Sequence, residues 1–200
     1  MTRSKTVTDE EILAAARSLF LEVGIKASTR KIAQNAGISE AVIFQRFKTK
    51  EELFFSAMVP PKARLEEIFR VHPGENIVPE NLELISLQIV EYFREVMPTF
   101  IALIGHPAFN MQTFLQRHTM PRIQIGNRLS AYLYAEAEIG RIRSSQVEIA
   151  VSILLSYLHH LAMSETIDAH QKKVKGDIPG AIGALWQGLE PIDKAQQTEN

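Results

Sequence analysis

The chain has 200 residues, of which 46% are hydrophobic, and its formal net charge at pH 7 is −1. This length and composition predict one large or two small globular domains with a buried core, and they exclude a disordered chain. The sequence has no cysteine, which excludes disulfides, thiol catalysis and cysteine-ligated zinc. The polar first residues and the lack of a run of about 20 apolar residues favour a cytoplasmic protein without a membrane span.

The charge is unevenly distributed along the chain. Residues 26–50 contain six basic residues and one acidic residue, a net charge of +5, so the remainder of the chain carries −6. A basic segment on a slightly acidic protein indicates either a local contact with a polyanion or an ordinary solvated face.

The N-terminal quarter carries strong helix signals. Thr8 and Glu11 form a capping box before an apolar pattern at helical spacing, and Gly24 is a natural end for that helix. Gly37 suits a tight turn between two further short helices. Four helices are expected here, with starts near Thr8, Ser28, Ser39 and Thr49.

The remaining chain is also predicted to be helical, because no stretch shows sustained apolar–polar alternation. The "VPP" sequence at 59–61 is expected to break the fourth helix, with helix resuming at Pro61. A later helix is expected to stop before Pro98. Helices are expected over about 80–97, 121–139, 145–166 and 179–189.

Two short helices joined by a glycine turn and packed on a preceding helix predict a helix-turn-helix, whose second helix enters the DNA major groove. On that helix Gln45 can pair with adenine, Arg46 with guanine, and Glu40 can accept from cytosine. Basic and hydroxyl side chains nearby suit phosphates. The alternative is a helical hairpin that serves only as core. The expected DNA-binding residues are Ser28, Thr29, Arg30, Ser39, Glu40, Ala41, Val42, Phe44, Gln45, Arg46, Lys48 and Lys50.

The segment "SLFLEVGIKASTRKIAQNAGISEAVIFQRFKTKEEL" resembles the DNA-binding domain of the TetR family of bacterial transcription regulators. The shared pattern is a helix ending "LF...G", followed by "IA..AG(V/I)S", an aromatic residue, and "F..K..L". Phe44 stands where the family recurrently has tyrosine, Arg46 where it often has histidine, and Glu40 where it often has a basic or small residue. The family's lysine at the start of helix four is Lys50.

The resemblance implies a homodimer whose last two long helices form a four-helix interface, with the middle helices enclosing a ligand. The stretch "IAVSILLSYLHHLAM" at 149–163 is apolar around nearly its whole circumference, so it is expected to be buried on two sides. A partner chain accounts for the second side; the alternative is the central helix of a monomer. Leu154, Leu158 and Trp186 are the expected interface residues.

The 21 residues between Glu95 and Arg117 contain no Asp, Glu, Lys or Arg. Their methionine and phenylalanine side chains suit an adaptable apolar pocket, although such residues also form ordinary core. The histidines have no cysteine or carboxylate at metal-ligand spacing, so neither a metal nor a cofactor is expected. The expected ligand-binding residues are Met97, Phe100, Ile104, His106, Phe109, Met111, Phe114 and His118.

Together these features predict an all-α protein with a three-helix helix-turn-helix domain at residues 1–53 and a larger ligand-binding and dimerisation domain at 54–200. The expected function is repression of transcription, relieved when a mainly apolar small molecule releases the protein from a pseudo-palindromic operator. The alternatives are an all-helical enzyme that binds a small molecule, or a helical adaptor. The sequence shows no phosphate loop, nucleophile elbow or metal cluster, which disfavours an enzyme.

Overall fold

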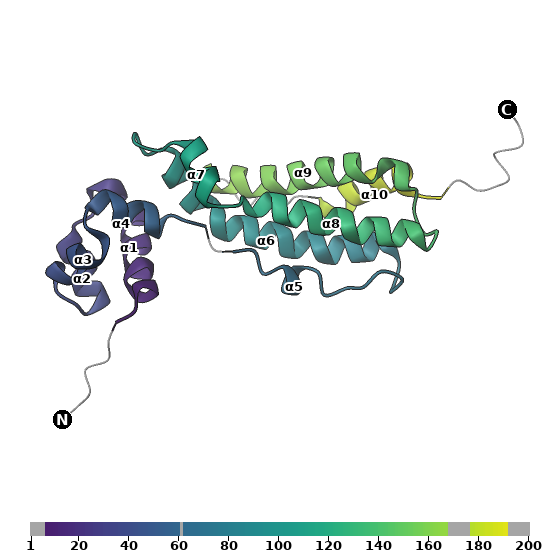
Figure 1. The fold of residues 1–200 in the computed structure, drawn as a ribbon. Helices are drawn as coiled ribbons and strands as arrows, with labels where there is room; N and C mark the ends of the chain where they lie inside the picture. Colours follow the sequence, from purple (N-terminus) through teal and green to yellow (C-terminus); the bar gives the residue numbers. More distant parts are fainter. Residues whose placement is uncertain (1–6, 61, 168–176, 192–200) are drawn as a thin grey trace, which may run out of the picture. The chain divides into compact units, whose positions relative to one another are not determined.

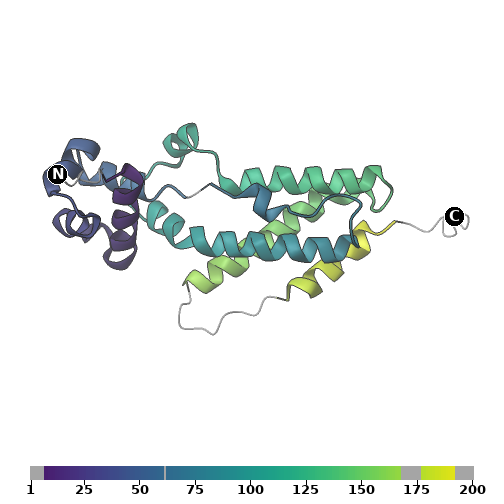
Figure 2. The same cartoon turned by 90° about the horizontal axis from the view of Figure 1, so that it is seen from below.

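The computed structural model describes residues 7–60, 62–167 and 177–191, and every regular element in these ranges is a helix (Figures 1 and 2). The all-α prediction is therefore confirmed. The chain forms two compact units. Unit 1 combines Met1–Pro61 with Pro98–Phe114, and unit 2 combines Lys62–Met97 with Leu115–Asn200. The predicted boundary after residue 53 instead falls inside a helix of unit 1.

Unit 1 begins with the helices that the sequence predicts. At the start of α1 the capping box is formed: the Glu11 amide donates to Thr8 Oγ1 at 3.2 Å, and the Thr8 amide donates to Glu11 Oε2 at 2.9 Å. Gly37 ends α2 in the left-handed conformation, with φ +71°. The elements are α1 (Asp9–Val23), the 3-10 turn η1 (Gly24–Lys26), α2 (Thr29–Ala36), α3 (Glu40–Phe47) and α4 (Lys50–Ala57).

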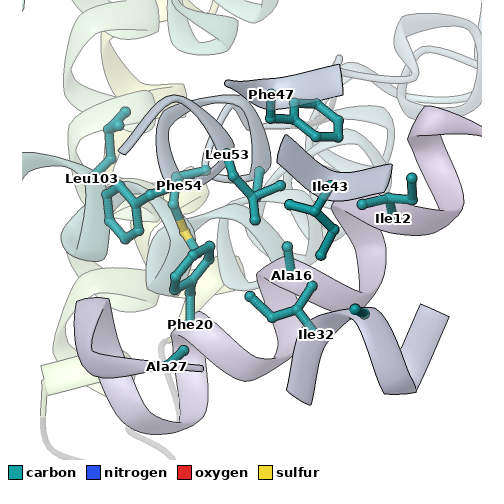
Figure 3. Packing of buried hydrophobic residues seen from close by; sticks show 13 residues of the cluster. Ile12, Ala16, Phe20, Ala27, Ile32, Ile43, Phe47, Leu53, Phe54 and Leu103 are labelled. Atoms are coloured by element: carbon teal, nitrogen blue, oxygen red, sulfur yellow. The ribbon is translucent and has the colours of Figure 1, made fainter. Parts of the chain in front are cut away.

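The core of unit 1 draws side chains from all four of these helices (Figure 3). Ile43 and Phe47 of α3 lie among side chains of α1, α2 and α4, and Ile43 is completely buried. Phe20 of α1 and Phe54 of α4 meet edge to face at 5.1 Å between ring centroids. Aromatic pairs in this geometry add about 0.5–1.5 kcal/mol to the burial of their area.

A second segment of the chain completes this core. Leu103 is completely buried in the same cluster. The ring of His106 lies 4.8 Å from that of Phe54 and 4.9 Å from that of Phe55, measured between centroids. Unit 1 thus extends beyond residue 53 because α4 and the Pro98–Phe114 segment bury their apolar side chains in it.

The predicted break after the fourth helix is present. α4 ends at Ala57, and the chain then has only the short α5 (Leu65–Ile68) before α6 (Val78–Ile104). Residues 62–64 are not helical, so helix does not resume directly after the prolines. Pro61 itself lies outside the described residues.

The predicted end of the next helix before Pro98 is wrong, because α6 continues through this proline to Ile104. An internal proline removes one backbone hydrogen bond and costs about 3 kcal/mol. Buried side chains on both sides offset that cost: Met97 and Thr99 are each 2% exposed, and Leu103 is 0% exposed. Pro98 is also the residue at which α6 passes from unit 2 to unit 1.

Unit 2 is built on three long helices: α6 up to Met97, α8 (Pro121–Glu138) and α9 (Val147–Ile167). α8 and α10 (Ile178–Leu189) both pack against α9. The helices of unit 2 are drawn in Figures 1 and 2. The short α7 (Met111–Arg117) precedes α8, and the 3-10 turn η2 (Ser144–Gln146) precedes α9.

A buried polar network joins the helices of unit 2 to the loop before α6. Glu136 is completely buried and accepts hydrogen bonds from the Tyr132 hydroxyl at 2.7 Å and the Gly74 amide at 3.2 Å. Arg141 Nη1 pairs with its carboxylate at 3.1 Å. Asn81 donates to the Tyr132 oxygen at 2.9 Å. Burial raises the pKa of Tyr132, and its hydrogen bond to Glu136 raises this pKa further.

We predict that Glu136→Ala lowers the free energy of unfolding by about 2–3 kcal/mol, because it removes the acceptor of the buried Tyr132 hydroxyl and of the Gly74 amide and one partner of Arg141. Glu138→Ala removes an exposed carboxylate from the same helix and should change the free energy of unfolding by less than about 0.5 kcal/mol. Chemical denaturation of both variants measures the difference. Equal stabilities would contradict the role given to Glu136.

Candidate nucleic-acid interface

Helix α3 has one buried face and one exposed face. Ile43 and Phe47 anchor the buried face in the core of unit 1. The exposed face carries side chains at positions i, i+3 and i+4, which align on one side of a helix, and Lys48 follows as the C-cap residue with φ +40°. We call this set the α3 stripe; its members are Ala41, Phe44, Gln45 and Lys48.

The start of α3 adds hydrogen-bond donors beside the stripe. Ser39 is the N-cap residue, and its side chain makes no capping hydrogen bond, although the Val42 amide donates to the Ser39 carbonyl at 3.1 Å. Helix N-termini in this state favour phosphate oxygens. Four of the predicted DNA contacts are exposed at the start of α3 or on its stripe: Ser39, Ala41, Phe44 and Gln45.

Two of the predicted contacts bind each other. The Thr29 hydroxyl at the start of α2 donates to the Glu40 carboxylate at the start of α3. This bond joins the two helices of the helix-turn-helix and occupies one oxygen of Glu40. Ser28 caps α2, since its Oγ accepts from the Lys31 amide at 3.4 Å. The Thr29–Glu40 bond could not be found from the sequence, whereas a helix start at Ser28 was predicted and is confirmed.

Arg46, the predicted guanine reader, lies off the α3 stripe. Its Nη1 donates to the Val7 carbonyl oxygen at 2.8 Å and to Asp9 Oδ1 at 2.9 Å. Only 27% of its side chain is exposed. Arg46 therefore ties α3 to the start of α1. Helical spacing already places it on a different side from Gln45, but the partner Asp9 could not be found from sequence.

The basic side chains of residues 26–50 remain mostly in solvent. Among the predicted contacts, the basic residues Arg30 and Lys48 are exposed and Lys50 is half-buried. Val42, an apolar predicted contact, is also half-buried. Sequence reasoning left Lys26 and Lys31 out of the predicted contacts, although both are exposed and both contribute to the +5 charge of this segment. The charge count was the signal that identified them.

The eight predicted ligand-binding residues are divided between the units. Phe100, Phe109 and Phe114 pack against the core of unit 1, and His106 stacks there between two phenylalanines. The His106 Nδ1 also accepts from the Ala108 amide at 3.1 Å. In unit 1, Ile104 and Met111 are exposed; in unit 2, Met97 is buried and His118 is half-buried.

These contacts show the charge-free stretch acting as core of unit 1. Ligand contact by the same residues stays a prediction. Among the described residues, no group of three or more His, Cys, Asp or Glu side chains is placed to hold a metal ion.

The predicted dimer residues on α9 are already buried within one chain: Leu154 is 2% exposed and Leu158 is 0% exposed. Their burial needs no partner chain, because other parts of the same chain cover them, with α8 and α10 both packed against α9. The apolar residues that α9 leaves in solvent are Ile149, Ile153 and Ile167. Trp186 on α10 is half-buried.

The segment Ser144–Ile167 is long and apolar enough to cross a membrane, judged by length and composition alone, with a mean hydropathy of 1.4. Inside unit 2, 44% of this stretch is buried, and core helices of water-soluble proteins meet the same criteria.

Comparison with known protein families agrees with the helix-turn-helix of unit 1. Residues 12–57 match the family model described as bacterial regulatory proteins of the tetR family. This range runs from α1 to the end of α4 and includes the whole helix-turn-helix.

Solved structures share the fold along nearly the whole chain. A protein of Mesorhizobium loti, assigned to the TetR family of transcriptional regulators, is 16% identical with a TM-score of 0.72, and the match covers 91% of this chain and 96% of that one. SmeT in complex with triclosan is 17% identical with a TM-score of 0.64, and 92% of each chain is covered. NalD of Pseudomonas aeruginosa, the secondary repressor of the MexAB-OprM multidrug efflux pump, is 18% identical with a TM-score of 0.56, covering 91% and 96%.

The family match lies on the helices that form the candidate interface, and the shared fold extends over both units. Residues 12–57 therefore match the tetR family of bacterial regulatory proteins, and 91% of the chain shares the fold of a solved TetR-family structure.

Proposed function

We propose that this regulator is a homodimeric repressor that binds a pseudo-palindromic DNA site through the α3 stripe and leaves the site when a small molecule binds. It acts in the cytoplasm, and the proposal includes no catalytic step. The observation that carries it is the division of α3, in which buried Ile43 and Phe47 hold Gln45 in solvent on the opposite face, with Lys48 exposed at the end of the helix.

The chemistry of the stripe suits DNA. Gln45 offers an amide that pairs with the N6 and N7 groups of adenine. Phe44, 41% exposed, is an apolar side chain for a thymine methyl. Lys48 and the uncapped amides of α3 supply phosphate donors.

Selection of bound sequences from randomised duplex DNA, followed by affinity measurements over a range of salt concentrations, tests DNA binding directly. The proposal expects an enriched site with two related half-sites and an affinity that falls steeply with salt. If no sequence were enriched and no salt-dependent binding were seen, the proposal would be contradicted.

We predict different effects from two substitutions on the stripe. Gln45→Ala should cost about 1–3 kcal/mol on the best site and relax the preference at one or two base pairs. Lys48→Gln should weaken all duplexes alike and reduce the salt slope by about one. Titration of specific and scrambled duplexes with both variants measures the contrast. Identical uniform losses would refute this division of roles.

Arg46 is assigned the role of holding α3 in place. We predict that Arg46→Ala lowers the free energy of unfolding by about 1–2 kcal/mol, because it leaves a half-buried contact empty. Binding should weaken on all duplexes alike. Asp9→Ala, which removes one of the two partners, should show a smaller loss of the same kind. Relaxed preference at one or two base pairs in Arg46→Ala, with Asp9→Ala unchanged, would instead identify Arg46 as a base reader.

The small-molecule part of the proposal draws on the relatives. SmeT is seen in complex with triclosan, and NalD is described as a repressor. If Phe100, Phe109 and Phe114 contact a mainly apolar ligand here, the ligand must displace side chains that pack on the core holding α3. Such a ligand would act directly on the DNA-binding unit.

The dimer is proposed to form through the exposed face of α9. Ile149, Ile153 and Ile167 lie on that face and are 60%, 51% and 70% exposed. α10 beside it exposes small residues, including Gly183 and Ala184, which allow close approach of another helix. A two-fold axis here would present two α3 stripes to half-sites about 34–36 Å apart.

We predict that Ile153→Glu weakens the dimer about 5- to 30-fold, because it places a charge in an apolar interface. Leu84→Glu on α6 is the control, since Leu84 is also 51% exposed but lies off this face. Sedimentation over a concentration series measures both. A monomeric wild-type protein, or equal weakening by both substitutions, would rule out this interface.

A further inference from the structure

Unit 2 contains a cavity of about 470 Å³ between the short helix α5 and the middle of α6. Its volume falls in the range of about 300–1,000 Å³ that is typical of small-molecule sites. Eight residues line it, none of which was predicted to bind a ligand: Arg64, Glu67, Ile68, Gln88, Glu91, Tyr92, Arg94 and Glu95. We call this cavity the α5–α6 cleft.

The floor of the cleft is apolar and aromatic. Ile68 and Tyr92 are 5% and 6% exposed. Burial raises the pKa of Tyr92, and the negative charge of Glu95 raises it further, so the phenol stays neutral. A neutral tyrosine ring attracts cations over its face.

The carboxylates of the cleft outnumber its available cations. Arg94 is neutralised on both sides, with 2.7 and 2.8 Å hydrogen bonds to Glu165 and a 2.5 Å bond to Glu91. Hydrogen bonding to Glu165 raises the pKa of Arg94, as expected for a tightly paired guanidinium. Arg94 therefore contributes little repulsion to a cationic ligand.

Arg64 is held much more weakly. Its guanidinium lies 3.4 Å from Glu67 and 3.5 Å from Glu95, and 66% of its side chain is exposed. Exposed ion pairs contribute about 0.2–1 kcal/mol, so a ligand can displace Arg64 into solvent at small cost. Glu67 on α5 and Glu95 on α6 would then face the ligand from two sides.

We propose that the α5–α6 cleft binds a monovalent organic cation with an aromatic or apolar body, its charge between Glu67 and Glu95 and its body against Tyr92 and Ile68. Arg64 occupies the position of the positive charge when the cleft is empty. Binding itself is independent of the proposed function; only an effect of the cation on DNA affinity rests on that function.

The test uses two probes of matched shape and opposite charge, tetraphenylphosphonium and tetraphenylborate, titrated into the full chain. The proposal expects the cation to bind and the anion to bind about fivefold more weakly, because one ion pair is worth about 1 kcal/mol. Equal affinities would overturn it.

Substitutions locate the site. Glu67→Gln and Glu95→Gln should each weaken binding of the cation about 2- to 5-fold, and Arg64→Ala should strengthen it by a similar factor. Glu66→Gln is the control, since Glu66 is an exposed carboxylate on α5 outside the lining. If Glu66→Gln matched Glu67→Gln, or if Arg64→Ala weakened binding, the cleft would not be the site.

A parallel titration with the selected DNA separates this proposal from the proposed function. Lower DNA affinity with tetraphenylphosphonium, lost in the Glu67→Gln/Glu95→Gln double variant, supports both. If the affinity for the cation changes with the substitutions as expected but the protein binds no DNA, the result supports the cleft and contradicts only the proposed function.

Discussion

The burial of Ile43 and Phe47 is the constraint on which the DNA-binding surface depends. A helix as short as α3 is not stable alone in water, so its orientation is set by the core into which it packs. Once those two side chains are fixed between α1, α2 and α4, helical geometry leaves Phe44 and Gln45 in solvent, and Lys48 is exposed at the end of the helix. The chemistry offered to DNA is therefore a consequence of packing inside unit 1.

Sequence patterns predicted the elements whose signals are local. The capping box at Thr8, the glycine turn at Gly37 and the break after α4 all depend on residues a few positions apart, and all are present. The continuation of α6 through Pro98 was missed because it depends on burial along both sides of the helix. Local rules measure the cost of a proline, but tertiary packing supplies the energy that offsets it.

Partners of individual side chains were the least predictable part of the candidate site. Arg46 and Asp9 are 37 positions apart, and nothing near either residue indicates their ion pair. The composition of residues 96–116 likewise fits a pocket as well as a core, and only the contacts of Phe100, Phe109 and Phe114 show that they pack in unit 1. On α9, hydrophobicity on all sides predicted two buried faces, but Leu154 and Leu158 are on the face that the same chain covers.

The position of the α5–α6 cleft on α6 bears on how a ligand there would affect DNA binding. A proline donates no backbone hydrogen bond, so Pro98 leaves the carbonyl of Arg94, four residues earlier, without its usual helical donor. Arg94 also lines the cleft, and its side chain joins α6 to α9 through Glu165. A cation that pairs with Glu95 would change the ion pairs of α6 within one turn of this weak point. α6 also enters unit 1 at Pro98 and buries Leu103 in the core that holds α3, so a single helix carries residues of the cleft as well as a packing contact of the DNA-binding core.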